Sequence, residues 1–167
     1  MSDSRIDRAI SFLEQNGIAY ERHDHEAVFT VEQASKVESI GIGARTKNLF
    51  VRDKKGKRHV LIVVPHDVSV DLMSLGEITG YGRLSFASEQ RMNTYLGLSP
   101  GSVTLMGVIN DPQHQVDVII DARIWNSDFV RCHPLQNTST VVISNQGLKS
   151  IFKATGHVPQ IMTVPTL

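Results

Sequence analysis

The chain has 167 residues, with 17 Lys and Arg against 17 Asp and Glu, and a formal net charge of zero when His is counted as neutral. This length favours one domain over residues 1–167, with a sizeable core of its own. A balanced charge argues against a broad nucleic-acid-binding surface, but not against recognition of a short end of a nucleic acid.

Several classes of protein are disfavoured by what the sequence lacks. The single cysteine, Cys132, excludes an internal disulfide and fits a reducing compartment. No apolar run approaches membrane-spanning length, and the first residues lack the apolar core of a signal peptide. Neither a Walker-type loop nor a Gly-x-Ser-x-Gly elbow is present. We therefore expect a cytoplasmic protein with no membrane partner and no cofactor.

The first elements are predicted from apolar spacing and from capping residues. An apolar stripe at helical spacing predicts a helix that Ser4 and Asp7 cap and Gly17 ends. A short strand over residues 18–23 follows. Thr30 then opens a second predicted helix.

A strand is predicted over Arg45–Arg52, with a turn at residues 53–56. Because side chains alternate along a strand, Lys47 shares a face with Leu49 and Val51. Burying an unpaired ammonium is costly, so Lys47 either extends its amine to solvent or lines a cavity. The residues alone leave both interpretations open.

The rest of the chain alternates between helices and strands. Residues 60–64 form an unbroken apolar run, typical of a central strand covered on both faces. There follow a helix within 67–75, a strand at 84–86, a helix from Ser88 to Gly97, a turn-rich loop at 98–104 feeding a strand, strands at 116–120, 129–133 and 138–143, a helix from Asn145 to Gly156, and a strand at 158–164. This order predicts an α/β or α+β domain with a mixed, mostly antiparallel β-sheet flanked by helices.

Three groups of residues are candidates for chemistry. His23 and His25 share a strand face, but no other cluster of metal-binding residues accompanies them, which favours a hydrogen-bonding pair over a metal site. Cys132 and His133 are adjacent, so a strand directs them to opposite faces and disfavours a thiolate–imidazole pair. The basic run at 54–58 is typical of an exposed hairpin and is also suited to contacting phosphates.

Segments spread over nearly the whole chain follow one another in a characteristic order. They are HDHEAVFTVEQA (23–34), TKNLF (46–50), LGLSPGSVT (96–104), Gly107, CHPLQNTSTVVIS (132–144) and ATGHVP (154–159). Together they resemble the YbaK/aminoacyl-tRNA deacylase family of free-standing prolyl-tRNA editing proteins. Within that family the chain is most similar to the branch that clears alanine from mischarged tRNA(Pro).

The resemblance implies a YbaK-like fold and hydrolysis of the ester that joins a wrong amino acid to tRNA(Pro), with alanine as the first choice. A Cys- or Ser-specific deacylase and a non-enzymatic aminoacyl-tRNA or nucleotide-binding module are the alternatives. The implied partners are the aminoacylated acceptor end of tRNA and, as a further candidate, prolyl-tRNA synthetase.

The family's functional positions can be carried over to this chain. The implied catalytic residues are Lys47, Asn48 and Gly107, and the implied substrate-binding residues are Thr46, Phe50, Ser99, Pro100, Gly101, Ser102, Cys132 and His133. No metal is implied. The pair Leu105–Met106 departs from the Pro-aromatic pair expected after Thr104, which bears on the shape of the pocket floor.

The implied chemistry is physically reasonable. An aminoacyl ester is already activated, so its hydrolysis needs positioning and charge stabilisation more than a strong nucleophile. A cationic Lys47 near the carbonyl or the adjacent phosphate, and backbone N–H groups between Gly101 and Gly107, would supply that stabilisation. The neighbouring ribose hydroxyl can direct the water. Because Ala is smaller than Pro, a tight pocket admits the error and excludes the correct product.

Overall fold

The strands of the protein form two separate sheets. The structure, a computed structural model, describes residues 4–27 and 42–167. Their elements are α1 (Ser4–Gln15), β1 (Tyr20–Asp24), β2 (Thr46–Asp53), β3 (His59–Pro65), α3 (Leu72–Thr79), β4 (Leu84–Phe86), α4 (Glu89–Leu96), the 3-10 helix η2 (Leu105–Asn110), β5 (Val116–Asp121), α5 (Ala122–Trp125), β6 (Phe129–Cys132), β7 (Ser139–Ser144), α6 (Asn145–Thr155) and β8 (Gln160–Met162).

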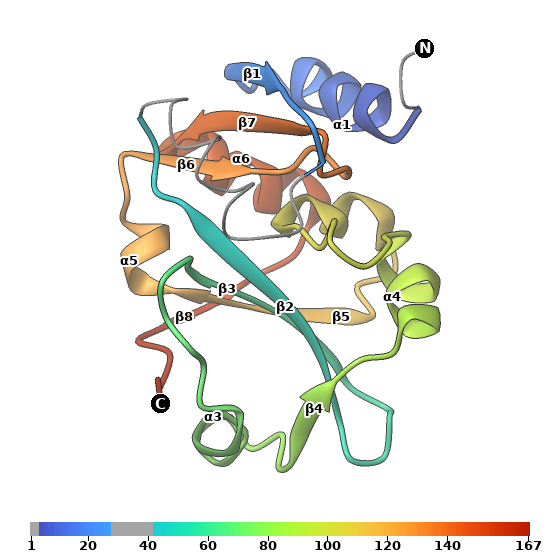
Figure 1. Cartoon of the computed structure of the whole chain (residues 1–167), viewed down its shortest axis with the longest axis vertical. Helices are drawn as coiled ribbons and strands as arrows, with labels where there is room; N and C mark the ends of the chain where they lie inside the picture. Colours follow the sequence, from blue (N-terminus) through green and yellow to red (C-terminus); the bar gives the residue numbers. More distant parts are fainter. Residues whose placement is uncertain (1–3, 28–41) are drawn as a thin grey trace.

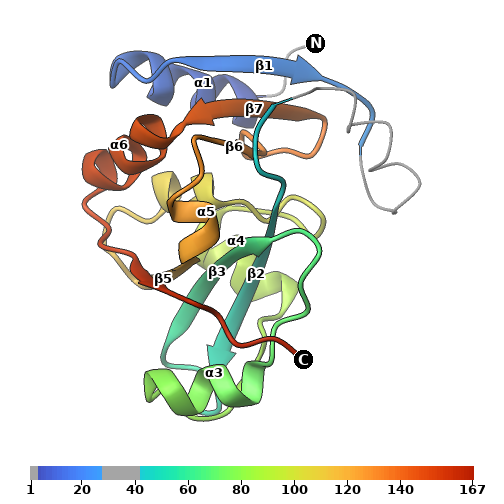
Figure 2. The same cartoon turned by 90° about the vertical axis from the view of Figure 1, so that its left-hand side faces the viewer.

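The smaller sheet is antiparallel and has the order β1-β7-β6, whereas the larger has the order β4-β2-β3-β5-β8. In the larger sheet β2 is antiparallel to both of its neighbours, and β5 is parallel to β3 and to β8. The smaller sheet lies with α1 at one end of the molecule, and α3 lies at the other (Figure 1 and Figure 2). The predicted α+β class is confirmed, although the strands divide between two sheets.

Two hydrophobic cores cover opposite faces of the larger sheet. The first joins both sheets to α1, α4, α6 and η2, and the second joins the larger sheet to α3 and the C-terminal segment. Along β3, Leu61 and Val63 belong to the first core, while Val60, Ile62 and Val64 belong to the second. The prediction of a central strand covered on both faces is therefore confirmed.

The helices with local capping signals are also confirmed. The Ser88 side chain accepts the Arg91 N–H at the start of α4, and Gly97 ends that helix with a φ of 63°. Gly156, with a φ of 81°, ends α6 in the same way. A left-handed residue at this position satisfies the last carbonyls of a helix, and glycine adopts it without steric cost.

Other elements differ from their predictions. The helix expected within 67–75 begins only at Leu72, because the Asp71 carboxylate caps it by accepting the Ser74 N–H at 3.1 Å. The loop at 98–104 leads into η2 instead of a strand, since the Thr104 hydroxyl accepts the Met106 N–H at 3.3 Å. The last strand, β8, is shorter than expected.

The remaining comparisons concern one helix that was not predicted, one predicted helix that cannot be compared, and the Leu105–Met106 pair. The short helix α5 was not predicted, and the helix expected to open at Thr30 lies outside the described residues. Leu105 and Met106 are fully buried in the first core, so this departure from the family pattern affects core packing. Within residues 4–27 and 42–167, no helix is long and apolar enough to span a membrane.

Candidate active site

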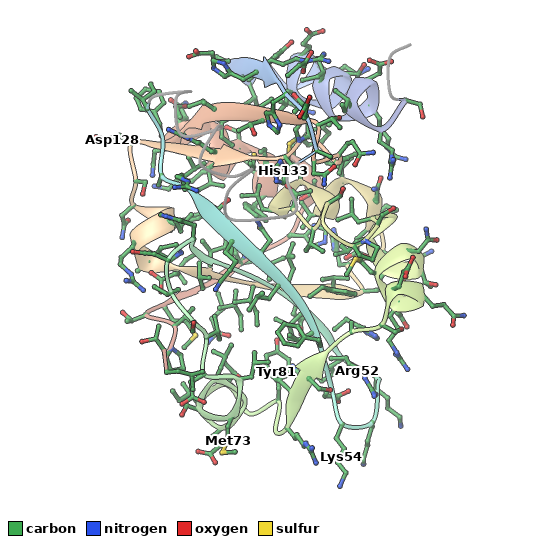
Figure 3. All side chains as sticks on the ribbon, in the orientation of Figure 1. Arg52, Lys54, Met73, Tyr81, Asp128 and His133 are labelled. Carbon is green, nitrogen blue, oxygen red and sulfur yellow. The ribbon has the colours of Figure 1, made fainter. Side chains whose placement is uncertain are left out.

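The start of β2 is bonded to β6 of the other sheet. The Ala44 N–H donates to the Phe129 carbonyl at 2.8 Å, and the Arg131 N–H donates to the Ala44 carbonyl at 2.9 Å. The Thr46 hydroxyl then donates to the Arg131 carbonyl at 2.8 Å. His133 follows β6 directly and lies beside β6 and β7 in Figure 3. The chain thus brings Thr46 and its neighbours to the end of β6 where His133 lies.

His133 is held as a neutral imidazole by backbone contacts. Its Nδ1 lies 3.0 Å from the Ser139 carbonyl, and because a carbonyl only accepts, Nδ1 carries the proton. Burial lowers the pKa of His133 below its ordinary value, which favours the neutral form at pH 7. No described residue bonds to Nε2. That atom therefore offers a lone pair to a hydrogen-bond donor.

His25 lies against His133, with ring centroids 6.5 Å apart in an edge-to-face arrangement. His25 Nδ1 lies 2.7 Å from the Glu26 carbonyl, so Nδ1 carries the proton, and Nε2 accepts the Thr140 hydroxyl at 2.8 Å. The sequence favoured a hydrogen-bonding role for His23 and His25 over a metal site, but it did not predict this contact with His133. The contact between His25 and His133 arises because β1 pairs with β7, and a local sequence pattern does not reveal that pairing. The only indication in the sequence was that His25 belongs to the HDHEAVF segment of the family resemblance. Among the described residues, no group of three or more metal-binding side chains is present.

The glycine-containing loop is joined to the segment that follows His133. The Thr104 hydroxyl donates to the His133 carbonyl at 2.7 Å, and the Ser102 hydroxyl donates to Gln136 Oε1 at 2.8 Å. Gly101, with a φ of 84°, permits the turn before Ser102. Ser99, Pro100 and Gly101 are exposed. The loop therefore lies next to the segment that begins at His133.

Lys47 extends from the opposite face of β2. It is half-buried, and its amine donates a hydrogen bond to the Val68 carbonyl in the loop between β3 and α3. Thr46 and Asn48 alternate with Lys47 and so point toward the first core, as Phe50 does. No hydrogen bond or ion pair joins Lys47 to His133 among the described residues. The amine is thus anchored to backbone, which neither interpretation from the sequence included.

One edge of β2 has a gap in its strand pairing among the described residues. Beyond the contact of Thr46 with β6, the next contact along this edge is the Phe50 carbonyl, which accepts the Ala87 N–H, and β4 pairs only with Val51–Asp53. Residues 47–49 have no strand partner on this side within the described part of the chain. The Oδ1 atom of Asn48 is buried there and has no hydrogen-bond partner in residues 4–27 and 42–167. An unsatisfied buried acceptor is costly, which makes it a candidate ligand contact.

Gly107 is closely packed, and its backbone N–H is already bonded within the protein. Its N–H already donates to the Thr104 carbonyl at 2.9 Å. A Cβ at this position would lie 3.0 Å from Leu98 Cδ1 and 3.4 Å from Leu96 Cδ2. The small residue therefore lets η2 pack closely against the segment that follows α4.

Two of the expected substrate-binding residues lie in the first core. Phe50 is 2% exposed and stacks on His59, with ring centroids 5.7 Å apart. Cys132 is 4% exposed, and burial raises the pKa of its thiol to about 12. A thiol held protonated in this way is neither a nucleophile nor an accessible contact. Both side chains therefore contribute to the packing of the first core.

The basic hairpin lies at the other end of β2. The Asp53 carboxylate accepts the N–H groups of Lys57 at 2.9 Å and Arg58 at 3.1 Å, which fixes the turn. Figure 3 shows Arg52 and Lys54 at the end of the molecule opposite His133. The hairpin is therefore separate from the residues around His133.

The chain belongs to the aminoacyl-tRNA editing family. Residues 25–151 match the aminoacyl-tRNA editing domain, which is well over half of the chain. The family resemblance expected from the sequence is thereby confirmed.

Individual relatives cover most of the chain. It is 38% identical over 148 residues to the prolyl-tRNA editing protein ProX of Acetoanaerobium sticklandii, which covers 89% of this chain and 90% of the relative. It is 34% identical over 143 residues to the mouse prolyl-tRNA synthetase associated domain-containing protein 1, with 83% and 84% covered. A solved structure described as a candidate trans-editing enzyme for prolyl tRNA synthetase matches with a TM-score of 0.74 at 17% identity, over 100% of both chains. This last match supports the fold.

The protonation of His133 is directly measurable. We expect its pKa to lie below about 6.5, the ordinary histidine value, because burial disfavours the imidazolium. Long-range ¹H–¹⁵N NMR across a pH titration should show a neutral ring with the proton on Nδ1, and a His133→Gln variant assigns the signal. Because the unfolded chain binds this proton more readily, stability should fall as the pH drops below about 6.5, and His133→Gln should weaken that dependence. A midpoint at or above 6.5 would contradict this account.

Proposed function

We propose that the protein is a trans-editing deacylase that hydrolyses the ester of mischarged tRNA(Pro), with Ala-tRNA(Pro) as its preferred substrate. The observation that carries this proposal is the 38% identity to ProX over about nine-tenths of both chains. The domain match over residues 25–151 supports the same assignment, since it spans Lys47, Asn48 and His133. The aminoacylated acceptor end of tRNA is then the natural partner of the gap at the edge of β2.

In this proposal Lys47 stabilises the negative charge that develops on the ester carbonyl. An ammonium has three N–H groups, and the Val68 carbonyl takes one of them. Two N–H groups are left for the substrate. An anchored cation stabilises the transition state without first having to be ordered, which is the main source of electrostatic catalysis.

Asn48 and His133 supply hydrogen-bond acceptors for the amino acid. The unpartnered Oδ1 of Asn48 and the Nε2 lone pair of His133 both suit the N–H groups of an α-ammonium. A neutral imidazole is required for this role, because an imidazolium would repel the ammonium. The lowered pKa of His133 provides that neutral form at pH 7.

Selection against proline follows from size. A pocket that fits an alanine side chain excludes the larger proline ring by steric clash, whereas a pocket for proline could not reject alanine as strongly. The correctly charged Pro-tRNA(Pro) therefore survives, and the error is hydrolysed.

The test is a panel of tRNA(Pro) charged with Ala, Ser, Cys or Pro, followed under single-turnover conditions. We expect Ala-tRNA(Pro) to be hydrolysed fastest, and Pro-tRNA(Pro) at least about 100-fold more slowly, as a size-excluding site requires. A preference for the Cys or Ser ester would reassign the substrate within the family. Tight binding of all four without hydrolysis would mean that the protein is a binding module.

Replacement of Lys47 tests the catalytic assignment within the same assay. Lys47→Met keeps an unbranched apolar stem and removes the charge, so the single-turnover rate on Ala-tRNA(Pro) should fall about 100-fold or more. The melting temperature should stay close to that of the parent. Lys153→Ala, at an exposed position of α6, is the matched control and should leave the rate unchanged. A Lys47→Met variant as active as this control would remove Lys47 from the chemistry.

We also propose that the hairpin contacts tRNA phosphates. Since β2 has eight residues and a strand rises about 3.3 Å per residue, the hairpin lies roughly 26 Å from the start of β2. A tRNA whose end lies at the gap therefore reaches it only with its double-helical stem. Replacing Lys54, Lys55 and Lys57 by Ala should weaken tRNA binding and flatten its dependence on salt. The double variant Lys149→Ala/Lys153→Ala, on α6, is the control. Equal salt slopes in all three proteins would exclude the hairpin from phosphate binding.

A further inference from the structure

We propose that the segment Val164–Leu167 is a positioning element for Lys47, because it holds the loop whose carbonyl binds the lysine amine. This inference rests on the proposed deacylase function for its activity readout, but it also has a readout that is independent of activity. We call residues 164–167 the strap and residues 66–71, between β3 and α3, the anchoring loop.

The strap pairs with the anchoring loop through backbone groups. The Leu167 N–H donates to the Ser69 carbonyl at 2.9 Å, and the Asp71 N–H donates to the Pro165 carbonyl at 2.9 Å. Between these bonds, Val70 and Thr166 form an antiparallel bridge. Both views show the C-terminal segment beside the chain that leads into α3 (Figure 1 and Figure 2).

The strap is itself fixed to the larger sheet. Val164 is 2% exposed and packs in the second core, and its N–H donates to Asp121 Oδ2 at 3.0 Å. Asp121 is fully buried at the end of β5, where its other oxygen accepts the Arg123 side chain at 3.0 Å. Because the strap is bonded to both, it holds the anchoring loop in place against the larger sheet.

The anchoring loop sets the place of the lysine amine. Val68 and Val70 pack against the second core, and the Val68 carbonyl accepts the Lys47 amine. A lysine side chain is long and flexible, so an unanchored amine would sample many positions. The only hydrogen bond that the described residues make to this amine comes from the loop held by the strap. Loosening the strap should therefore disorder the amine while β2 itself stays in place.

A merely structural role predicts something different. If the strap only covered the second core, its loss would lower stability without changing the rate of the folded enzyme. A positioning role lowers the rate of the chemical step at unchanged substrate affinity, since a displacement of about 1 Å can cost about 100-fold in rate. It also exposes the Lys47 amine to reagents. These two readouts separate positioning from packing.

The test compares two substitutions at one position. Leu167→Pro removes the N–H that donates to Ser69, whereas Leu167→Ala keeps that N–H and alters only a side chain that is 89% exposed. A chain shortened to end at Val164 removes both backbone pairs and keeps the core residue. Each variant is assayed for single-turnover hydrolysis of Ala-tRNA(Pro), for tRNA affinity, and for acetylation of Lys47 by acetic anhydride, followed by mass spectrometry.

We expect Leu167→Pro to lower the hydrolysis rate about 10-fold or more, with affinity within twofold of the parent, and the shortened chain to lose at least as much. Lys47 acetylation should speed up in both variants, while Leu167→Ala matches the parent in every readout. Unchanged rates and unchanged Lys47 acetylation in both strap variants would overturn the proposal, as would unfolding of both. If the parent hydrolyses no aminoacyl-tRNA, the proposed function fails, and the acetylation rates alone decide the role of the strap.

Discussion

The site depends on the course of β2, a single strand that faces two different cores. Its first residues bond to β6 of the smaller sheet, and its later residues pair with β3 and β4 of the larger one. Strand alternation then sends Thr46 and Asn48 toward one core and Lys47 toward the other. The charged group and the neutral acceptors are thereby separated by one strand. Residues 47–49 of β2 have no strand partner on one edge among the described residues.

Backbone carbonyls orient the titratable side chains of this region. Lys47 is bound by the Val68 carbonyl, His133 by the Ser139 carbonyl and His25 by the Glu26 carbonyl. A carbonyl accepts but never donates, so it fixes which imidazole nitrogen carries the proton. It also carries no charge, so it binds the Lys47 amine without forming an ion pair. The orientation of these side chains is therefore set by the backbone of the fold.

The sequence predicted the elements whose signals are local. Ser88 with Gly97, and the apolar run of β3, define their elements within a few residues, and the structure confirms both. The strand expected after residue 104 was wrong because a Thr104 cap and a small Gly107 together favour a 3-10 helix. Residues that belong to the same family motif also differ in how deeply they are buried. Phe50 and Cys132 lie in the core, whereas His133 is only partly buried and keeps a ring nitrogen that no described residue bonds, a difference that no motif spacing encodes.

Contacts between distant parts of the chain could not be predicted from the sequence, because they depend on how the strands are ordered in the sheets. The pair His25 and His133 requires that β1 pair with β7, and the anchor of Lys47 requires that the loop before α3 lie beside β2. Both are consequences of sheet order, which local propensity does not determine. A charged residue on an apolar strand face left two interpretations open, an amine that reaches solvent or one that lines a cavity, because burying a free ammonium is too costly. Only the fold shows that the Lys47 amine is bound by the main chain of another segment.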